Sequence, residues 1–377
     1  DELKKQEAAF QQRIAVQHAD IEQREASIAA AHVTLAEREA ALAQADAALA
    51  ALRAELAEAK AANLAVPDTH DYDEADTRRL FIDVLLREAG WDEGAGMSVE
   101  VPVTGMPNAP GEGYVDYVMW GADGKPLAVV EAKRSLKDPE IGRQQAKLYA
   151  DCLEAMKGQR PLIYYSNGHQ TWLWDDRRAP PREVQGFQNR EELQQAITRR
   201  SLLQDPRTLP INTAIAGRPY QQRAIRAMAE AFVQGRRAGL LTMATGTGKT
   251  RTAVALVDLL MRANWVKRVL FLADRVALVR QATNAFKAHL PDASPVNLVL
   301  DRHGQGRVYL STYPTMMGLI EEMDGACRKY GVGHFDLVII DEAHRSVYQK
   351  YGAIFRYFDS HLMGLTATPR DEVDRDT

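Results

Sequence analysis

The sequence predicts an α/β protein of three parts: a long N-terminal helix, a mixed α/β domain and a parallel α/β lobe. Residues 1–66 contain no Gly or Pro and include 23 alanines, a composition that favours an unbroken helix. After residue 67, short apolar runs alternate with segments of helical periodicity, which is typical of sheets covered by helices. Two apolar runs in the C-terminal part end in polar loops, as strands of a parallel sheet do. We therefore expect domains at residues 1–66, 67–200 and 201–377.

The N-terminal segment carries a regular hydrophobic repeat. Its isoleucines and leucines recur at seven-residue intervals: Ile14, Ile21, Ile28, Leu35, Leu42, Leu49 and Leu56. Such a repeat predicts a coiled-coil seam, and one continuous helix would extend roughly 90 Å at ~1.5 Å per residue. The companion positions are poorly apolar until Ala45, so the seam is narrow. A helical hairpin, or a helix lying along its own protein, explains the pattern as well as a coil between two chains does.

Composition excludes several classes of protein. Cys152 and Cys327 are the only cysteines, too few for a disulfide framework or a zinc site, which favours a reducing, cytoplasmic compartment. No apolar run approaches the ~18 residues of a membrane span, so we expect no membrane partner. The net charge of −4 arises in residues 1–66, which hold 7 basic and 11 acidic residues. Net charge therefore gives no indication of nucleic-acid binding.

The middle part of the sequence predicts a series of helices and strands. The expected elements are a helix over residues 72–89 that Gly90 ends, strands over 113–120 and 125–135, a helix over 140–155, and a hairpin formed by PLIYYSNG and TWLWDD. The segment Gly-Ala-Asp-Gly between the first two strands predicts a short connection. These two strands should therefore pair as a hairpin.

One group of polar residues falls on these elements. Glu131 and Lys133 are two positions apart on a strand, so their side chains should face the same side. Asp116 lies in the middle of the neighbouring strand, where an apolar residue would be expected. Two carboxylates and an ammonium suit a hard cation such as Mg²⁺, with Lys133 to orient or activate an attacking water. Gln145 and Tyr149 share one face of the next helix. A solvated edge strand is the simpler interpretation of each residue taken alone.

This arrangement resembles the PD-(D/E)xK nucleases. The resemblance implies a catalytic set formed by Asp116, Glu131, Lys133, Gln145 and Tyr149, in which Asp116 and Glu131 are the metal ligands. Val115 replaces the proline that commonly precedes the aspartate, which the family tolerates. The family often has an acid on its first helix, and Glu74 is the candidate for this further metal ligand.

The C-terminal part contains a phosphate-binding pattern. The apolar run Gly239–Met243 enters the loop ATGTGKT, and a helical pattern follows from Thr250. Gly246 and Gly248 allow backbone N–H groups to turn inward around a polyphosphate. Lys249 can reach the β- and γ-phosphates, and the Thr250 hydroxyl can bind Mg²⁺. The predicted ATP-binding loop comprises Thr245, Gly246, Thr247, Gly248, Lys249 and Thr250.

A second motif, FDLVIIDEAH, follows later in the chain. Its apolar run Leu337–Ile340 predicts a strand that delivers two carboxylates at its carboxyl end. We expect Asp341 to hold the Mg²⁺ of the nucleotide and Glu342 to polarise the attacking water. The two motifs in this order predict an ATP-hydrolysing protein.

From Tyr220 to Pro369 the motifs resemble, in order, those of superfamily 2 helicases and translocases, which implies a RecA-like motor lobe. Gln221 matches the residue that reads the adenine edge, FLADRVALVRQ and STYPTM look like DNA-backbone-contacting segments, and TATP looks like the segment that couples ATP to nucleic acid. Met243 replaces the Gly or Ala that usually begins the loop. In this family a second lobe carries an arginine finger. We expect the chain to be a fragment without that lobe, which binds ATP weakly, hydrolyses it poorly and does not translocate.

The combination resembles the restriction (R) subunits of prokaryotic type I restriction–modification enzymes. The segments EAGW, VVEAKRS and QAKLYADCLE, and the order of nuclease before motor, carry this resemblance. Type III restriction subunits carry the nuclease after the motor. The resemblance implies ATP-dependent translocation on double-stranded DNA, Mg²⁺-dependent cleavage, and partner methyltransferase (M) and specificity (S) subunits. The alternatives are a DNA-repair or remodelling translocase with a non-cleaving nuclease-like domain, and an assembly scaffold with degenerate sites.

Overall fold

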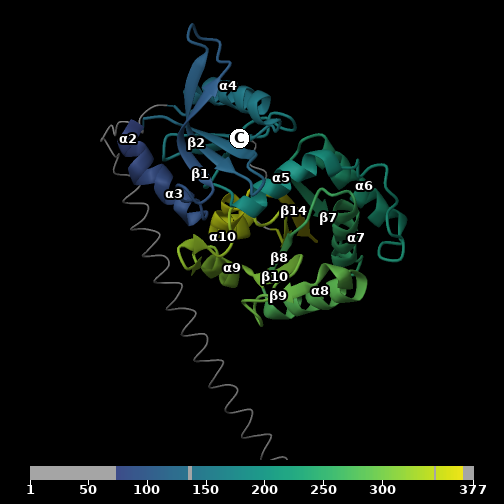
Figure 1. Ribbon diagram of the computed structural model, residues 1–377. Helices are drawn as coiled ribbons and strands as arrows, with labels where there is room; N and C mark the ends of the chain where they lie inside the picture. The colour runs from purple at the N-terminus through teal and green to yellow at the C-terminus, as the bar shows by residue number, and fades with distance from the viewer. Residues whose placement is uncertain (1–73, 135–137, 344, 368–377) are drawn as a thin grey trace, which may run out of the picture. The chain divides into compact units, whose positions relative to one another are not determined.

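The computed structural model describes residues 74–134, 138–343 and 345–367 (Figure 1). The described residues belong to one compact unit, Asp71–Thr377. The predicted coiled coil at residues 1–66 lies outside the described residues. Within the described ranges, no helix is long and apolar enough to cross a membrane.

The first sheet has six strands in the order β1-β2-β3-β4-β5-β6. The bounds are β1 Met97–Thr104, β2 Glu112–Trp120, β3 Pro126–Ala132, β4 Leu162–Ser166, β5 Thr171–Trp174 and β6 Arg182–Val184. Neighbouring strands are antiparallel except β3 and β4, which run parallel. A parallel pair needs a crossover, and the helix α4 (Glu140–Lys157) provides it.

Helices cover both faces of this sheet. On one face, Ala146, Tyr149 and Leu153 of α4 pack into a core with strand residues. The opposite face is covered by a segmented helix and by α5 (Arg190–Leu202). The segmented helix consists of α2 (Glu74–Thr77), the π-helical turn η1 (Arg78–Ile82) and α3 (Asp83–Glu88). Asp116 and Glu131 therefore lie on a sheet that is enclosed on both sides.

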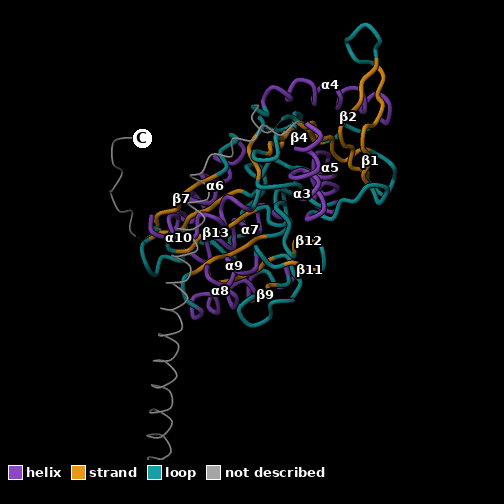
Figure 2. Tube along the Cα trace, turned by 90° about the vertical axis from the view of Figure 1, so that its left-hand side faces the viewer, coloured by secondary structure: helices purple, strands orange, loops and turns teal. Residues whose placement is uncertain are grey.

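The second sheet is entirely parallel and has the order β7-β14-β13-β8-β10-β9. Its strands are β7 Ala238–Thr242, β8 Val269–Ala273, β9 Pro295–Asn297, β10 Val308–Thr312, β13 Leu337–Asp341 and β14 His361–Thr366. Figure 2 shows these strands in orange among the purple helices. One face packs against α6 (Pro219–Val233), α7 (Lys249–Arg262) and α8 (Val276–His289). The other packs against α9 (Tyr313–Leu319) and α10 (Arg345–Tyr357). Two smaller elements complete the described chain: the 3₁₀ turn η2 (Pro291–Ala293) and the hairpin of β11 (Met323–Asp324) and β12 (Cys327–Arg328).

Ion pairs link the two sheets. The side chain of Asp359, which follows α10, is 5% exposed. It accepts hydrogen bonds from Arg182 of β6 at 2.7 and 2.6 Å and from Arg237 at 2.7 Å. Burial alone would raise the pKa of the Asp359 carboxyl, but the two guanidinium groups hold it well below its usual range. A further pair joins Arg199 of α5 to Asp336 at 2.6 Å. Residues far apart in the sequence are thus tied together by charge as well as by packing.

The mixed α/β class predicted from the sequence is confirmed, and the C-terminal sheet is parallel as expected. The sequence analysis missed β1, although its sequence, MSVEVPVT, has an apolar residue at every second position. The predicted strand over residues 125–135 was too long, because β3 ends at Ala132 and Lys133 follows it. The domain boundaries near residues 66 and 200 stay predictions.

Candidate functional site

The first candidate site lies where β2 and β3 separate. The register of the two strands shifts between Trp120 and Met119, and the pairing is then regular from Met119 to Tyr117. At the next residue, Oδ2 of Asp116 accepts a hydrogen bond from the backbone N–H of Ala132 at 2.7 Å. A side chain thus satisfies a backbone donor at the point where the regular strand pairing ends. This contact explains why a carboxylate is found in the middle of an otherwise apolar strand.

The other predicted residues of this site form one chain of contacts. Nζ of Lys133 lies 2.5 Å from Oε1 of Glu131 and donates to Oε1 of Gln145 at 3.2 Å. Nε2 of Gln145 then donates to the Tyr149 hydroxyl at 2.8 Å. The Glu131 residue is 2% exposed, so its ion pair with Lys133 is shielded from water and the two charges interact strongly. Burial is also the main cause that raises the pKa of Tyr149 above its usual value.

The helix α4 approaches this site closely at Gly142. A Cβ atom on Gly142 would lie 3.1 Å from Cε of Lys133 and 3.2 Å from Cγ of Glu131. These distances are shorter than ordinary van der Waals contact, so even a methyl group would push on the ion pair. The sequence analysis did not identify Gly142, although a glycine in the first turn of a predicted helix was a visible signal.

Arg78 is a second residue that the sequence analysis missed. Its Nη1 lies 3.2 Å from Oδ1 of Asp116, and its Nη2 lies 3.4 Å from Oε1 of Glu100 on β1. The predicted further ligand, Glu74, belongs to α2, but its side chain lies outside the described atoms. That assignment therefore stays a prediction.

The donor set is compatible with a small, hard cation. Within the described residues, no three or more His, Cys, Asp and Glu side chains are grouped as a metal site. Asp116 and Glu131 are nonetheless brought together by neighbouring strands, and Mg²⁺ commonly takes one or two carboxylates and retains several waters. Asp116 already attracts a cation, the guanidinium of Arg78. The site therefore fits a divalent ion held mainly by two carboxylates.

The second candidate site lies at the carboxyl edge of the parallel sheet. β7 ends at Thr242, and the loop that follows leads into α7, which begins at Lys249. Gly246 and Gly248 have φ angles of 81° and 90°, in the left-handed region that a glycine adopts without strain. The loop therefore has the backbone conformation that the phosphate-binding pattern predicts, with Thr250 in the first turn of α7.

The acidic motif lies next to this loop. β14 lies between β7 and β13 and pairs with both, so the carboxyl ends of the three strands share one edge of the sheet. Asp341 ends β13, and Glu342 follows with a φ angle of 51°, an uncommon conformation for a residue with a side chain. Nζ of Lys249 lies 3.1 Å from Oε1 of Glu342. Burial, and then the neighbouring Glu342, raise the pKa of the Asp341 carboxyl.

The residue predicted to read adenine contacts the loop itself. Nε2 of Gln221 donates to the carbonyl oxygen of Thr247 at 3.1 Å, and the Tyr220 hydroxyl donates to the same oxygen at 2.9 Å. A Cβ atom on Gly248 would lie 2.6 Å from Nε2 of Gln221. Gln221 and the phosphate-binding loop are therefore in direct contact, and a Cβ atom at residue 248 would displace the Gln221 amide.

One hydrogen bond links this site to a predicted DNA-contacting segment. Tyr313 belongs to the STYPTM motif, and its buried hydroxyl donates to the carbonyl oxygen of Asp341 at 2.8 Å. Its ring stacks on Tyr351 of α10, with the ring centroids 5.0 Å apart. No sequence pattern indicates this link, because it depends on how α9 and α10 pack on the sheet.

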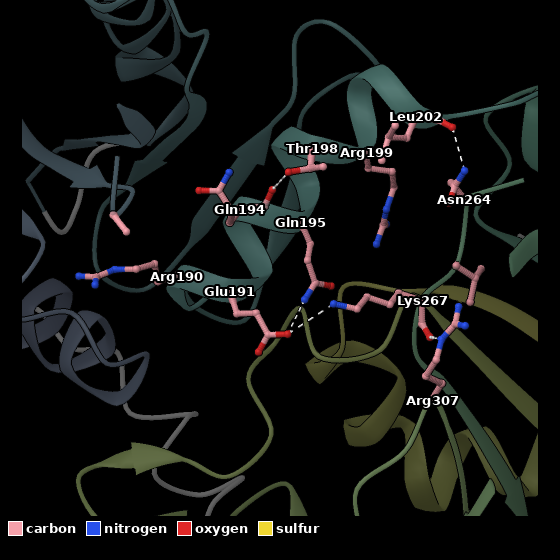
Figure 3. A pocket seen from close by; sticks show the side chains of 12 residues that line it. Arg190, Glu191, Gln194, Gln195, Thr198, Arg199, Leu202, Asn264, Lys267 and Arg307 are labelled. Carbon is pink, nitrogen blue, oxygen red and sulfur yellow. Dashed lines mark hydrogen bonds and ion pairs between the residues drawn. The ribbon is translucent and has the colours of Figure 1, made fainter. Parts of the chain in front are cut away.

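A pocket of about 610 Å³ lies elsewhere, beside α5 (Figure 3). Across the pocket, Nζ of Lys267 lies 3.6 Å from Oε1 of Glu191. Nδ2 of Asn264 donates to the carbonyl oxygen of Leu202 at 3.0 Å. Lys267 precedes β8 and Arg307 precedes β10. The pocket is thus at the amino ends of these strands, away from the carboxyl edge that carries the nucleotide loop, and it contains none of the predicted site residues.

Comparisons with known proteins agree with these motifs. Residues 214–371 match the family model "Type III restriction enzyme, res subunit". The chain is 31% identical over 332 residues to the Type I restriction enzyme EcoAI endonuclease subunit of Escherichia coli, covering 79% of this chain and 39% of that protein. It is 26% identical over 394 residues to the EcoKI endonuclease subunit of Escherichia coli K12, covering 81% and 33%. A solved fragment of a putative HsdR subunit of a type I restriction enzyme from Vibrio vulnificus YJ016 is 28% identical, covering 82% of this chain and 57% of that one, with a TM-score of 0.34.

The segment 214–371, which contains the nucleotide loop and the acidic motif, is similar to a segment found in restriction enzymes. Within that class, the two relatives that align over about four fifths of this chain are both type I endonuclease subunits. The chain is a relative of the R subunits of type I restriction enzymes, as its motifs predicted. It spans 39% and 33% of the length of these two relatives.

Proposed function

We propose that this chain is the nuclease and first motor portion of a type I restriction subunit, which pulls double-stranded DNA by hydrolysing ATP and cleaves it. The observation that supports this most strongly is that the chain carries two intact polar constellations on two different sheets. One joins Glu131, Lys133 and Gln145 to Tyr149. The other places Lys249 beside Glu342. Both sets of contacts favour two working sites over a scaffold with degenerate ones.

In the proposed nuclease, Asp116 and Glu131 would hold Mg²⁺. The ion would lower the pKa of a bound water and place a positive charge beside the scissile phosphate. Lys133, fixed by its contacts with Glu131 and Gln145, would orient the attacking water or steady the developing oxyanion. Tyr149 would position Gln145 and, through it, the lysine. Each of these roles is supported by a hydrogen bond as well as by the sequence pattern.

In the proposed motor, the loop Thr245–Thr250 would surround the phosphates of ATP. Lys249 would bind the β- and γ-phosphates, which requires it to leave Glu342, 3.1 Å away. Glu342 would then be available to polarise the attacking water. Thr250 and Asp341 would hold the Mg²⁺ of the nucleotide, and Gln221 would read the adenine edge. Related phosphoryl-transfer enzymes gain orders of magnitude in rate from an arginine finger, which we expect from a second lobe.

We further propose that sequence recognition lies with methyltransferase and specificity subunits of a bacterial restriction enzyme. The net charge of this chain is −4, which gives no sign of an extended DNA-reading surface. The boundaries of the proposed domains are those predicted from the sequence, 67–200 for the nuclease and 201–377 for the first RecA-like lobe. The segment at 1–66 is proposed to be a coiled coil.

The proposed function is tested with the full-length protein, assembled with its methyltransferase and specificity subunits. A supercoiled plasmid with recognition sites is incubated with Mg²⁺ and either ATP or a non-hydrolysable analogue. We expect double-strand cleavage only when ATP is hydrolysed. ATP hydrolysis stimulated by DNA without any cleavage would favour a repair or remodelling translocase, and absence of both activities would favour a scaffold.

A further inference from the structure

Arg78 is placed between two carboxylates of neighbouring strands. Its guanidinium approaches Asp116 on β2 at 3.2 Å and Glu100 on β1 at 3.4 Å. The side chains of Arg78 and Asp116 are only 22% and 16% exposed. Partial burial weakens the screening of this pair by water, so the interaction exceeds that of an ordinary surface ion pair.

The local backbone fixes Arg78 at this position. Arg78 is the first residue of the π-helical turn η1, and its carbonyl oxygen accepts from the backbone N–H of Asp83, five residues on. Such wide turns are rare and occur often at functional sites. Arg78 is therefore held by helix geometry close to a strand that lies 38 residues away in sequence.

The two oxygens of Asp116 have different partners. Oδ2 accepts from the backbone N–H of Ala132, which holds β3 against β2. Oδ1 is the oxygen that Arg78 approaches. A cation that binds Asp116 at Oδ1 meets the positive charge of Arg78 on the same oxygen. Both the lost ion pair and the repulsion between the two cations oppose metal binding.

The structure also provides a space that the Arg78 side chain could enter. A cavity of about 480 Å³ is lined by Arg78 together with Asp83, Arg87 and Tyr117. Asp83 accepts a hydrogen bond from the Tyr117 hydroxyl at 2.8 Å, so a carboxylate is present on this side. Arg78 therefore borders both Asp116 and this cavity.

We propose that Arg78 is a positioning residue that competes with the divalent cation for Asp116 and so sets the metal affinity of the cleavage site. It keeps the Asp116 carboxylate oriented before metal binds and withdraws when metal binds. The inference rests on the proposed function, because it takes Asp116 as a ligand of the nuclease metal. Arg78 itself does not touch the reacting atoms.

The test measures metal binding directly in the full-length protein. Mn²⁺ is titrated without nucleotide, and the free ion is followed by electron paramagnetic resonance. The site of interest is defined as the one that Asp116→Ala removes. At that site, Arg78→Gln should bind Mn²⁺ roughly threefold to tenfold more tightly than the parent, because it loses the charge of one partly buried ion pair. The Mg²⁺ concentration for half-maximal cleavage should fall by the same factor.

Two further variants keep the result interpretable. Arg87→Gln is the matched control, because Arg87 lines the same cavity but its guanidinium donates to the backbone oxygen of Asp83, at 3.1 Å, rather than to Asp116. It should leave Mn²⁺ affinity unchanged. Arg78→Lys retains the charge but loses the planar fork that reaches both carboxylates. It should give an affinity between those of the parent and Arg78→Gln, and it replaces Arg78→Gln if that variant does not fold.

The outcomes separate the inference from the function on which it rests. Unchanged or weaker Mn²⁺ affinity in folded Arg78→Gln overturns the competition. If cleavage also falls at every Mg²⁺ concentration, Arg78 instead contacts the DNA, which overturns the positioning role. If Asp116→Ala removes no Mn²⁺ site, the assignment of the nuclease metal fails, and this happens whatever Arg78 does.

Discussion

The two candidate sites are built in different ways. The nucleotide loop is one continuous stretch, Thr245–Thr250, at the carboxyl edge of a parallel sheet. Its conformation depends on the backbone, with Gly246 and Gly248 at positive φ. The nuclease set is collected from η1, β2, β3 and α4 and is held by contacts between side chains. The nucleotide loop is therefore specified locally, whereas the nuclease set exists only when the sheet and its helices have assembled.

The comparison also shows a common feature. In both sites a basic side chain contacts a carboxylate that is expected to work in catalysis: Lys249 contacts Glu342, and Arg78 contacts Asp116. In the nucleotide site, the proposed partner that displaces the contact is an anion, the phosphate of ATP. In the nuclease site, it is a cation. The two sites should therefore respond in opposite ways to loss of the basic residue: Lys249→Ala should lower ligand affinity, and Arg78→Gln should raise it.

The largest effect is expected from the nucleotide site. Glu342→Gln should reduce ATP hydrolysis by about 10²–10⁴-fold, because the side chain can no longer take up charge from the attacking water. Binding of a fluorescent ATP analogue with Mg²⁺ should persist, since Lys249 and Thr250 are intact. Glu183→Gln, an exposed change on β6, is the control. Equal losses of binding and hydrolysis would contradict the separate role given to Glu342.

The link between the two regions is expected to matter for stability. Asp359→Asn removes the buried negative charge that pairs with Arg182 and Arg237. Both guanidinium groups then lose this counter-charge. We expect the free energy of unfolding, measured in urea, to fall by about 3 kcal/mol. Asp205→Asn, which alters a solvent-screened pair with Arg207, should change it far less. Similar values for both variants would mean that the buried pair does not hold the two sheets together.

A pH-dependent effect is expected at α5, the helix between the two sheets. Burial is the main cause that raises the pKa of the Glu192 carboxyl to about 7. Between its unfolded value and about pH 7, the folded protein binds more protons, so its free energy of unfolding falls as the pH rises. Glu192→Gln should therefore stabilise the protein by roughly 1–2 kcal/mol at pH 8 and less at pH 5. The amide can still accept from the backbone N–H of Asn189, as the carboxylate does at 3.0 Å. If the stability gained by Glu192→Gln does not increase with pH, the Glu192 carboxyl does not ionise in the folded protein as described.

The smallest effect is expected from the outer part of the nuclease set. Tyr149→Phe removes only the hydroxyl that accepts from Gln145 at 2.8 Å. One such hydrogen bond contributes about 1 kcal/mol, so cleavage should slow by roughly tenfold or less while ATP hydrolysis is unchanged. Gln145→Ala should slow it somewhat more, because Lys133 then loses a contact. Complete loss of cleavage in Tyr149→Phe would place the hydroxyl among the catalytic groups.

The sequence predicted the parts of each site that repeat at a fixed spacing. Glu131 and Lys133 were linked by strand alternation, and Gln145 and Tyr149 by their spacing on a helix. The contact of Lys249 with Glu342 could be anticipated only from the order of the two motifs. The fold class followed from the same periodicities, since most elements had a clear apolar pattern.

The missed parts depend on packing between elements that are distant in sequence. Arg78 reaches Asp116 across 38 residues, and it does so from a π-helical turn that no periodicity indicates. Gly142 matters only because α4 lies against the Glu131–Lys133 pair. These features become visible only once the sheet is assembled.

The central claim is that one chain carries two separate active sites, and a reciprocal experiment tests it most directly. Asp116→Ala and Lys249→Ala are each assembled with the partner subunits, and cleavage and DNA-stimulated ATP hydrolysis are measured in the same samples. We expect Asp116→Ala to reduce cleavage by on the order of 10³-fold, through loss of a metal ligand, while ATP hydrolysis continues at the parental rate. Lys249→Ala should remove ATP binding and both activities. Parental cleavage by Asp116→Ala in Mg²⁺ would contradict the account and would favour a translocase whose nuclease-like domain only binds DNA.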